Sequence, residues 1–215
     1  CVDVGANAGY HTLLMADRVG PSGRVHAFEP NPPVFAKLTS NLALNPHVAG
    51  RVSPELRGLG RACEHLKLFQ AGAEPGNAYV SAEYNPRLWN SGSPSDFVTC
   101  EVVRLDDYLG TRTVDLMKID VEGMELEVLM GAEATIRRDT PTILYETLLE
   151  CFDHDEIRRT EVFLRNCGYL IFGIQVELGK LAATSFPRFQ EDTIAIHRTK
   201  VIEAADVLLN VGKFQ

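Results

Sequence analysis

Residues 1–12 read CVDVGANAGYHT, so a short apolar stretch runs directly into a loop with two glycines. Cys1–Val4 has the composition of a buried strand, and the residues after the loop repeat their apolar side chains at helical spacing. A strand that leads through a glycine-containing loop into a helix is the ligand-binding unit of doubly wound α/β folds, because the helix N-terminus offers free N–H groups. We therefore predict a ligand-binding loop at residues 5–9.

The rest of the chain alternates between strand-like and helix-like segments. Strands are predicted at 23–28, 113–119, 141–146, 169–175 and 192–198, and helices at 31–45, 122–139 and 155–168. Such alternation implies crossover connections, and hence a doubly wound, mostly parallel sheet covered by helices on both faces. The predicted fold class is therefore α/β, in one domain over residues 1–215.

The alternating rhythm breaks between about residues 53 and 113, where we predict an insertion. Two extra strands are expected there, at 65–70 and 96–105, separated in part by a long polar loop at 82–96. The first strand is also unusual, because the sequence begins inside it. Central strands average ~5–6 residues, so we expect that this N-terminal strand is truncated and that further residues precede Cys1.

Composition narrows the function classes. The chain has 215 residues and a formal net charge of -8, which gives no non-specific attraction to nucleic acid or to an anionic membrane. No apolar run reaches the ~18 residues of a membrane span, and no signal peptide is recognisable at the first residues. The five cysteines show no CxxC spacing, which favours reduced thiols. We predict a cytoplasmic protein without a nucleic-acid partner.

The glycine loop and the end of the second strand together indicate a ligand. A nicotinamide-binding loop prefers G-x-G-x-x-G, whose second glycine admits a pyrophosphate, but here Asn7 stands between Gly5 and Gly9. Asp3 precedes the loop, and Glu29 ends the second strand, where a carboxylate can accept both hydroxyls of a ribose. A lone glycine loop is often only a turn, but with Glu29 these residues predict a nucleoside without a diphosphate. S-adenosyl-L-methionine fits that description.

Five blocks of sequence, taken together, resemble a known family. They are VDVGANAGYHT (2–12), GRVHAFEPNP (23–32), LDDYL (105–109), DLMKIDVEGMELEVLMGA (115–132) and PTILYE (141–146). In order and spacing they are similar to FkbM-type S-adenosylmethionine-dependent methyltransferases, over most of residues 2–147. The resemblance implies a class I methyltransferase fold, a seven-stranded sheet whose last strand is antiparallel. It also implies O-methylation of a hydroxyl on a sugar, glycolipid or polyketide-type natural product.

Two positions depart from the family pattern. Many relatives carry an acidic residue near the adenine, in the segment after the third strand, where this chain has Arg61. His11 stands where relatives commonly have an aromatic residue. The first departure leaves the adenine contact open.

Methyl transfer from a sulfonium requires an aligned acceptor oxygen and, where one is in reach, a base for its proton. Asp120 ends the fourth strand, and we predict it as base, acceptor ligand or cofactor contact, or as the N-cap of the next helix. Glu146 ends the fifth strand and is predicted to contact the acceptor. Glu122 is interpreted as a charge at the helix N-terminus, and Lys118 as the structural partner of a carboxylate. Asp106 and Asp107 are expected to cap a short helix.

Asp120 and Glu146 are also carboxylates of the kind that bind a divalent cation. Nothing else in the sequence calls for one, so no metal is predicted.

Three functions remain open at this point. The first is an O-methyltransferase whose partner is a small-molecule or glycan hydroxyl acceptor. The second is a catalytically silent S-adenosylmethionine-binding or scaffold protein, which Arg61 favours. The third is a nicotinamide-dependent oxidoreductase, which Asn7 disfavours. The identity of the acceptor and the oligomeric state are not determined by the sequence.

Overall fold

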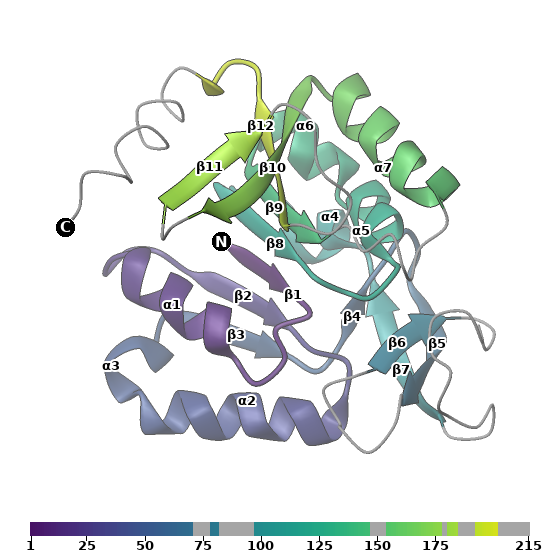
Figure 1. Cartoon of the computed structure of the whole chain (residues 1–215). Coiled ribbons are helices and arrows are strands. Elements are labelled where there is room, and N and C mark those ends of the chain that lie inside the picture. Colours follow the sequence, from purple (N-terminus) through teal and green to yellow (C-terminus); the bar gives the residue numbers. More distant parts are fainter. Residues whose placement is uncertain (71–77, 82–96, 147–153, 178–179, 185–191, 202–215) are drawn as a thin grey trace.

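The computed structural model describes residues 1–70, 78–81, 97–146, 154–177, 180–184 and 192–201 (Figure 1). The polar loop predicted at 82–96 lies outside the described residues. In the part that is described, no helix has both the length and the apolar character needed to cross a membrane.

A large sheet forms the centre of the molecule. Its strands are β1 Val2–Val4, β2 Val25–Phe28, β3 Val52–Glu55, β8 Leu116–Ile119, β9 Thr142–Glu146, β10 Tyr169–Glu177, β11 Lys180–Thr184 and β12 Asp192–His197. Their order is β11-β10-β12-β9-β8-β1-β2-β3. The neighbouring strands β9, β8, β1, β2 and β3 pair in parallel. β12 pairs antiparallel with both β9 and β10.

The predicted fold class is therefore confirmed: a mostly parallel sheet whose last strand in sequence, β12, runs antiparallel. One strand was missed. β11 adds an eighth strand at the edge, in a hairpin with β10. It is formed by the stretch KLAAT (180–184), for which the sequence pattern predicted no strand.

A smaller sheet lies within the predicted insertion. It has the order β4-β7-β5-β6, formed by β4 Gly58–Leu59, β5 Glu64–Gln70, β6 Ala78–Ser81 and β7 Phe97–Val103. The two predicted extra strands are thus confirmed as β5 and β7, which pair antiparallel. Figure 1 shows this sheet on the side to which the arrows of β1 and β2 point, so it flanks the carboxyl ends of the central strands. The single-domain boundary stays a prediction.

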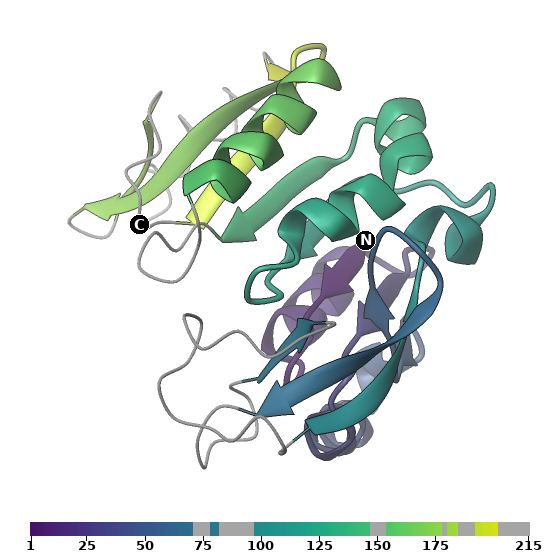
Figure 2. The same ribbon diagram turned by 90° about the vertical axis from the view of Figure 1, so that its right-hand side faces the viewer.

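Helices cover both faces of the large sheet. They are α1 Tyr10–Arg18, α2 Pro32–Leu44, α3 Pro46–Ala49, α4 Leu105–Leu109, α5 Glu125–Gly131, α6 Glu133–Asp139 and α7 His154–Asn166. The views in Figures 1 and 2 place α1 on one face and α4 to α6 on the other. The main core lies on the second face, where Val2 and Val4 of β1 pack with α5 residues such as Val128 and Leu129.

The single helix predicted at 122–139 is wrong, because the structure has two shorter helices there. Residues 120–124 form a loop in which Glu122 and Gly123 have positive φ angles of 54° and 106°. The break between α5 and α6 falls at Ala132, just after Gly131. A Cβ atom at Gly131 would overlap the backbone oxygen of Gly60, so this close approach of α5 to the small sheet requires glycine.

Asp106 and Asp107 were expected to cap the short helix α4, and this expectation is also wrong, because no side-chain hydrogen bond caps α4 within the described residues and its N-cap residue is Arg104. The Asp106 carboxylate accepts hydrogen bonds from the backbone N–H groups of Ala134 (3.0 Å) and Thr135 (2.9 Å), in the first turn of α6. A carboxylate whose two oxygens each accept from a free N–H group is a helix cap provided from a distant segment.

We expect Asp106→Ala to lower the free energy of unfolding by about 1–2 kcal/mol, as the loss of a capping side chain does. Asp107→Ala is the matched control, because the Asp107 side chain is more than half exposed and, among the described residues, pairs with Arg104 at 3.6 Å and the Cys63 thiol at 3.7 Å. Chemical denaturation of both variants measures the difference. Equal stability of the two would contradict the assigned cap.

Candidate active site

The glycine loop connects β1 to α1 and lies against two neighbouring strand ends. The backbone N–H groups of Gly5 and Ala6 donate to the carbonyl oxygen of Phe28, at 3.0 and 2.9 Å, which fastens the loop to the end of β2. Gly5, Asn7 and Gly9 have positive φ angles of 73°, 50° and 94°. Asparagine tolerates this left-handed region better than most residues do, which accounts for its presence between the glycines.

A close backbone contact also requires glycine at position 5. A Cβ atom there would overlap the backbone oxygen of Asp120, in the loop after β8. The glycine loop and the Asp120 loop therefore touch backbone to backbone. Two predicted site segments that are over a hundred residues apart in sequence are thereby brought into contact.

Glu29 lies at the end of β2, with its residue only 7% exposed. Its two carboxylate oxygens accept hydrogen bonds from the backbone N–H groups of Asn7 and Asn31, both at 2.9 Å. Burial raises the pKa of Glu29, and these two N–H donors and Lys118 oppose that rise. A carboxylate oxygen has room for a second donor, so Glu29 can hold the loop and still accept ribose hydroxyls. The ribose contact itself stays a prediction.

Asp3 is fully buried beneath the loop. One carboxylate oxygen accepts a hydrogen bond from the Thr12 hydroxyl at 2.6 Å, and the other lies 3.7 Å from the Lys118 ammonium. Burial raises the pKa of Asp3, against the influence of Lys118 and Thr12. In this position Asp3 joins β1 to α1 and supports the loop from below. Its predicted contact with a cofactor stays a prediction.

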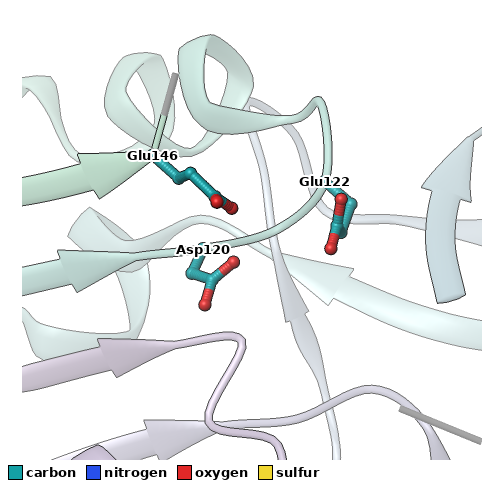
Figure 3. A group of neighbouring side chains, drawn as sticks. All are labelled: Asp120, Glu122 and Glu146. Carbon is teal, nitrogen blue, oxygen red and sulfur yellow. The ribbon is translucent and has the colours of Figure 1, made fainter. Parts of the chain in front are cut away.

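Asp120, Glu122 and Glu146 form a cluster of carboxylates at the carboxyl ends of β8 and β9, all partly buried (Figure 3). One oxygen of each lies within 4.8 Å of the others. Burial, and then the charges of Asp120, Glu122 and Asp192, raise the pKa of Glu146 to about 7. Burial and Asp120 also raise the pKa of Glu122. The sequence predicted Asp120 and Glu146, and the structure adds Glu122.

Asp120 is not the N-cap of the following helix, because α5 begins only at Glu125 and is preceded by Met124. The loop is held instead by the Glu125 carboxylate, which accepts from the N–H groups of Val121 (3.3 Å) and Gly123 (3.1 Å). Sequence reasoning missed Glu125, because nothing in its local pattern shows that the chain turns back over it. The Asp120 side chain is consequently left for the site.

Three clustered carboxylates also form the oxygen donor set that Mg²⁺ or Ca²⁺ accepts. Acidic groups gather in this way without a metal as well. The prediction that the site uses no metal therefore stays a prediction.

The two departures from the family pattern have clear positions. Arg61 contacts the sulfur of Met130 and pairs with Glu127 at 3.3 Å, so it lies against α5. His11 is exposed in the first turn of α1, beside the ring of Tyr10. Neither side chain joins the carboxylate cluster by a contact within the described residues.

A cavity of about 700 Å³ lies at the opposite edge of the sheet. Its lining includes Cys1, Arg24 and Asp115, which directly precede β1, β2 and β8. Ligands of open α/β sheets bind beyond the carboxyl ends of the strands. This cavity at the amino ends is thus separate from the candidate site.

Comparison with known proteins assigns the chain to a family. The family model described as "Methyltransferase FkbM domain" matches residues 3–171. "31-O-demethyl-FK506 methyltransferase FkbM" of Streptomyces tacrolimicus is 31% identical over 196 residues, which cover 80% of this chain and 73% of that protein. "Methyltransferase 1" of Beauveria bassiana is 34% identical over 146 residues, or 61% of this chain. This chain spans only 57% of the length of the Beauveria protein.

A solved structure shows the same fold. The crystal structure of methyltransferase FkbM from Methylobacillus flagellatus matches with a TM-score of 0.61 and 20% sequence identity, over 91% of this chain and 42% of that chain. The fold is thus that of the class I methyltransferases. This chain belongs to the FkbM methyltransferase domain family, and the resemblance inferred from its sequence blocks is confirmed.

Proposed function

We propose that this chain is an S-adenosylmethionine-dependent O-methyltransferase whose acceptor is a hydroxyl group of a sugar, glycolipid or polyketide-type natural product. The observation that carries the proposal is the contact between the glycine loop and the loop of Asp120, which brings the loop predicted to bind a nucleoside beside the carboxylate cluster. Family membership supports it. The name of the Streptomyces relative supports it too, since that acceptor is an O-demethyl compound.

The residues present fit S-adenosylmethionine. Gly5 leaves no side chain between the loop and the Asp120 backbone, and the N-terminal turn of α1 follows directly after Gly9. Glu29 presents a buried carboxylate at the end of β2, where it can accept ribose hydroxyls. When bound, the cofactor supplies an electrophilic methyl group. The chain supplies binding, orientation and the handling of the acceptor proton.

Glu146 is the residue best placed to take that proton. Its pKa of about 7 means that it is partly ionised near neutral pH, and a base is most effective when its pKa is close to the working pH. Asp120 lies beside it, so its charge raises the affinity of Glu146 for a proton. The assigned roles are therefore Glu146 as general base and Asp120 as its electrostatic partner and a contact for cofactor or acceptor.

Binding of S-adenosylmethionine and its demethylated product, measured by calorimetry, is the direct test. We expect binding of both ligands and no binding of NAD. We also expect Glu29→Gln to weaken cofactor binding by about tenfold or more, because hydrogen bonds to a charged group contribute about 1.5–3 kcal/mol. Glu64→Gln, an exposed position in β5, serves as the control.

The outcomes separate the competing functions. Binding of NAD alone would support the nicotinamide-dependent oxidoreductase. Cofactor binding without methyl transfer to hydroxylated sugars or polyketides would support a silent scaffold. Methyl transfer that survives chelation with EDTA would agree with the metal-free prediction, whereas loss of activity that Mg²⁺ restores would assign a cation to the carboxylate cluster.

The partners follow from the same proposal. A small-molecule or glycan acceptor is the expected partner, and the net charge of -8 disfavours nucleic acid. A cytoplasmic location stays a prediction that cell fractionation would test.

A further inference from the structure

Lys118 occupies a central place among the segments of the candidate site. It lies on β8 with its side chain only 14% exposed. Its ammonium group is 3.0 Å from the Asp120 carboxylate, 3.2 Å from the backbone oxygen of Gly5 and 3.7 Å from the Asp3 carboxylate. One side chain thus connects the glycine loop, the buried Asp3 of β1 and the carboxylate cluster.

The contacts of Lys118 differ in their importance for stability. A cation near Asp3 stabilises the folded chain whenever that carboxyl is ionised, because an unpaired buried charge is costly. The contacts with Gly5 and Asp120 are different, because neither group is fully buried and neither needs a cation for stability. They do, however, hold the glycine loop and the Asp120 side chain in one fixed arrangement.

We propose, on the basis of the proposed function above, that Lys118 is a positioning residue that fixes the place of the Asp120 carboxylate relative to the glycine loop and so tunes the charge cluster around Glu146. The 3.0 Å ion pair holds the Asp120 side chain beside the glycine loop, to which Lys118 also donates a hydrogen bond. The acceptor proton goes to Glu146, as proposed above. Glu146 is faced by Asp120 and Glu122 from the loop after β8 and by Asp192 from β12, and Lys118 acts on this group through Asp120.

The structural and positioning roles of Lys118 can be separated by a pair of variants. Lys118→Met alone leaves the Asp3 carboxylate buried without a cation, so this variant tests mainly folding. Asp3→Asn removes that requirement. The informative comparison is therefore Asp3→Asn against Asp3→Asn/Lys118→Met, in which the contacts with Gly5 and Asp120 are lost, together with the longer-range influence of Lys118 on Glu29. Lys37→Met, at an exposed position of α2, controls for the loss of a lysine.

The first readout is the titration of Glu146, followed by NMR with carboxyl-labelled glutamate and assigned through Glu146→Gln. Loss of a neighbouring cation makes a carboxylate pair hold its shared proton more tightly. Relative to Asp3→Asn, the double variant should show the Glu146 midpoint raised by about half a pH unit or more. An unchanged midpoint would overturn the proposal, because a merely structural lysine would leave the titration as it was.

The second readout is kinetic. We expect the double variant to lose about tenfold or more in kcat relative to Asp3→Asn, with the rising limb of the pH profile shifted upward. Lys37→Met should match the parent protein. Equal kcat and equal pH profiles in the two Asp3 backgrounds would also overturn the proposal. If the parent protein binds no S-adenosylmethionine, the proposed function fails, but the NMR titration still tests the effect of Lys118 on the cluster.

Discussion

Gly5→Ala is expected to lose cofactor binding and several kcal/mol of stability. A methyl group at this position would overlap the backbone oxygen of Asp120, which no side-chain rotation can relieve. The residue would also have to keep a φ of +73°, which costs a non-glycine residue about 1–2 kcal/mol. Overpacking adds about 1–3 kcal/mol. The two loops must move apart, so the nucleoside site and the carboxylate cluster lose their alignment.

Gly20→Ala separates the two causes. Gly20 has a similar φ of +72°, but a Cβ atom there meets nothing within 4 Å. It should therefore show only the cost of the left-handed backbone and bind the cofactor normally. Thermal unfolding and calorimetry with S-adenosylhomocysteine measure both effects. If Gly5→Ala is no less stable than Gly20→Ala and binds equally well, the backbone contact between the loops does not organise the site.

Glu146→Gln is expected to reduce kcat by about 10²–10⁴-fold, the usual contribution of a general base. In the parent protein, kcat/KM should rise with pH and level off above about 7, as Glu146 loses its proton. The variant should lack this rise, because glutamine does not titrate. The apparent midpoint belongs to the coupled pair of Glu146 and Asp120. A pH–rate profile of both proteins makes the comparison.

The same substitution should increase stability at alkaline pH. The pKa of Glu146 is raised from 4.5 to about 7 in the folded protein. The contribution of Glu146 to the free energy of unfolding is therefore fully present below pH 4.5 and is lost as the pH rises to 7. Glutamine is neutral throughout and avoids this loss. Because Glu146 is only partly buried, solvent reduces the effect, and we expect a gain of about 1 kcal/mol at pH 8.

Denaturant unfolding at pH 4.5 and at pH 8 tests whether Glu146→Gln gains stability although it loses activity. The variant should match the parent protein at the lower pH and exceed it at the higher one. Glu64→Gln, which is exposed, should change neither activity nor the pH dependence. A variant with full activity would remove Glu146 from the mechanism, and one that is less stable at pH 8 would contradict the charge crowding around it.

Residues 1–12 and Glu29 were found from sequence because their signals are local. A glycine loop has to follow its strand directly, and an acidic residue at the end of the second strand is specified by its place in the chain. The same holds for most strands and helices, whose apolar periodicity is visible in short windows. Asp120 and Glu146 were predicted because each ends a strand, and parallel strands bring such ends to one edge of a sheet.

Other features were decided only by the tertiary structure, because they depend on segments far apart in sequence. Asp106 was predicted to cap its own helix, but packing of α4 beside α6 turns its carboxylate toward Ala134 and Thr135. Lys118 was interpreted as a structural partner of one carboxylate, yet the pairing of β1 with β8 gives its ammonium two carboxylates and the oxygen of Gly5. The sequence by itself thus determined the fold class, the family and the strand ends at which the candidate site is predicted. The folded chain decided the charges and contacts within that site, since a carboxylate's pKa and a lysine's partners are set by neighbours in space.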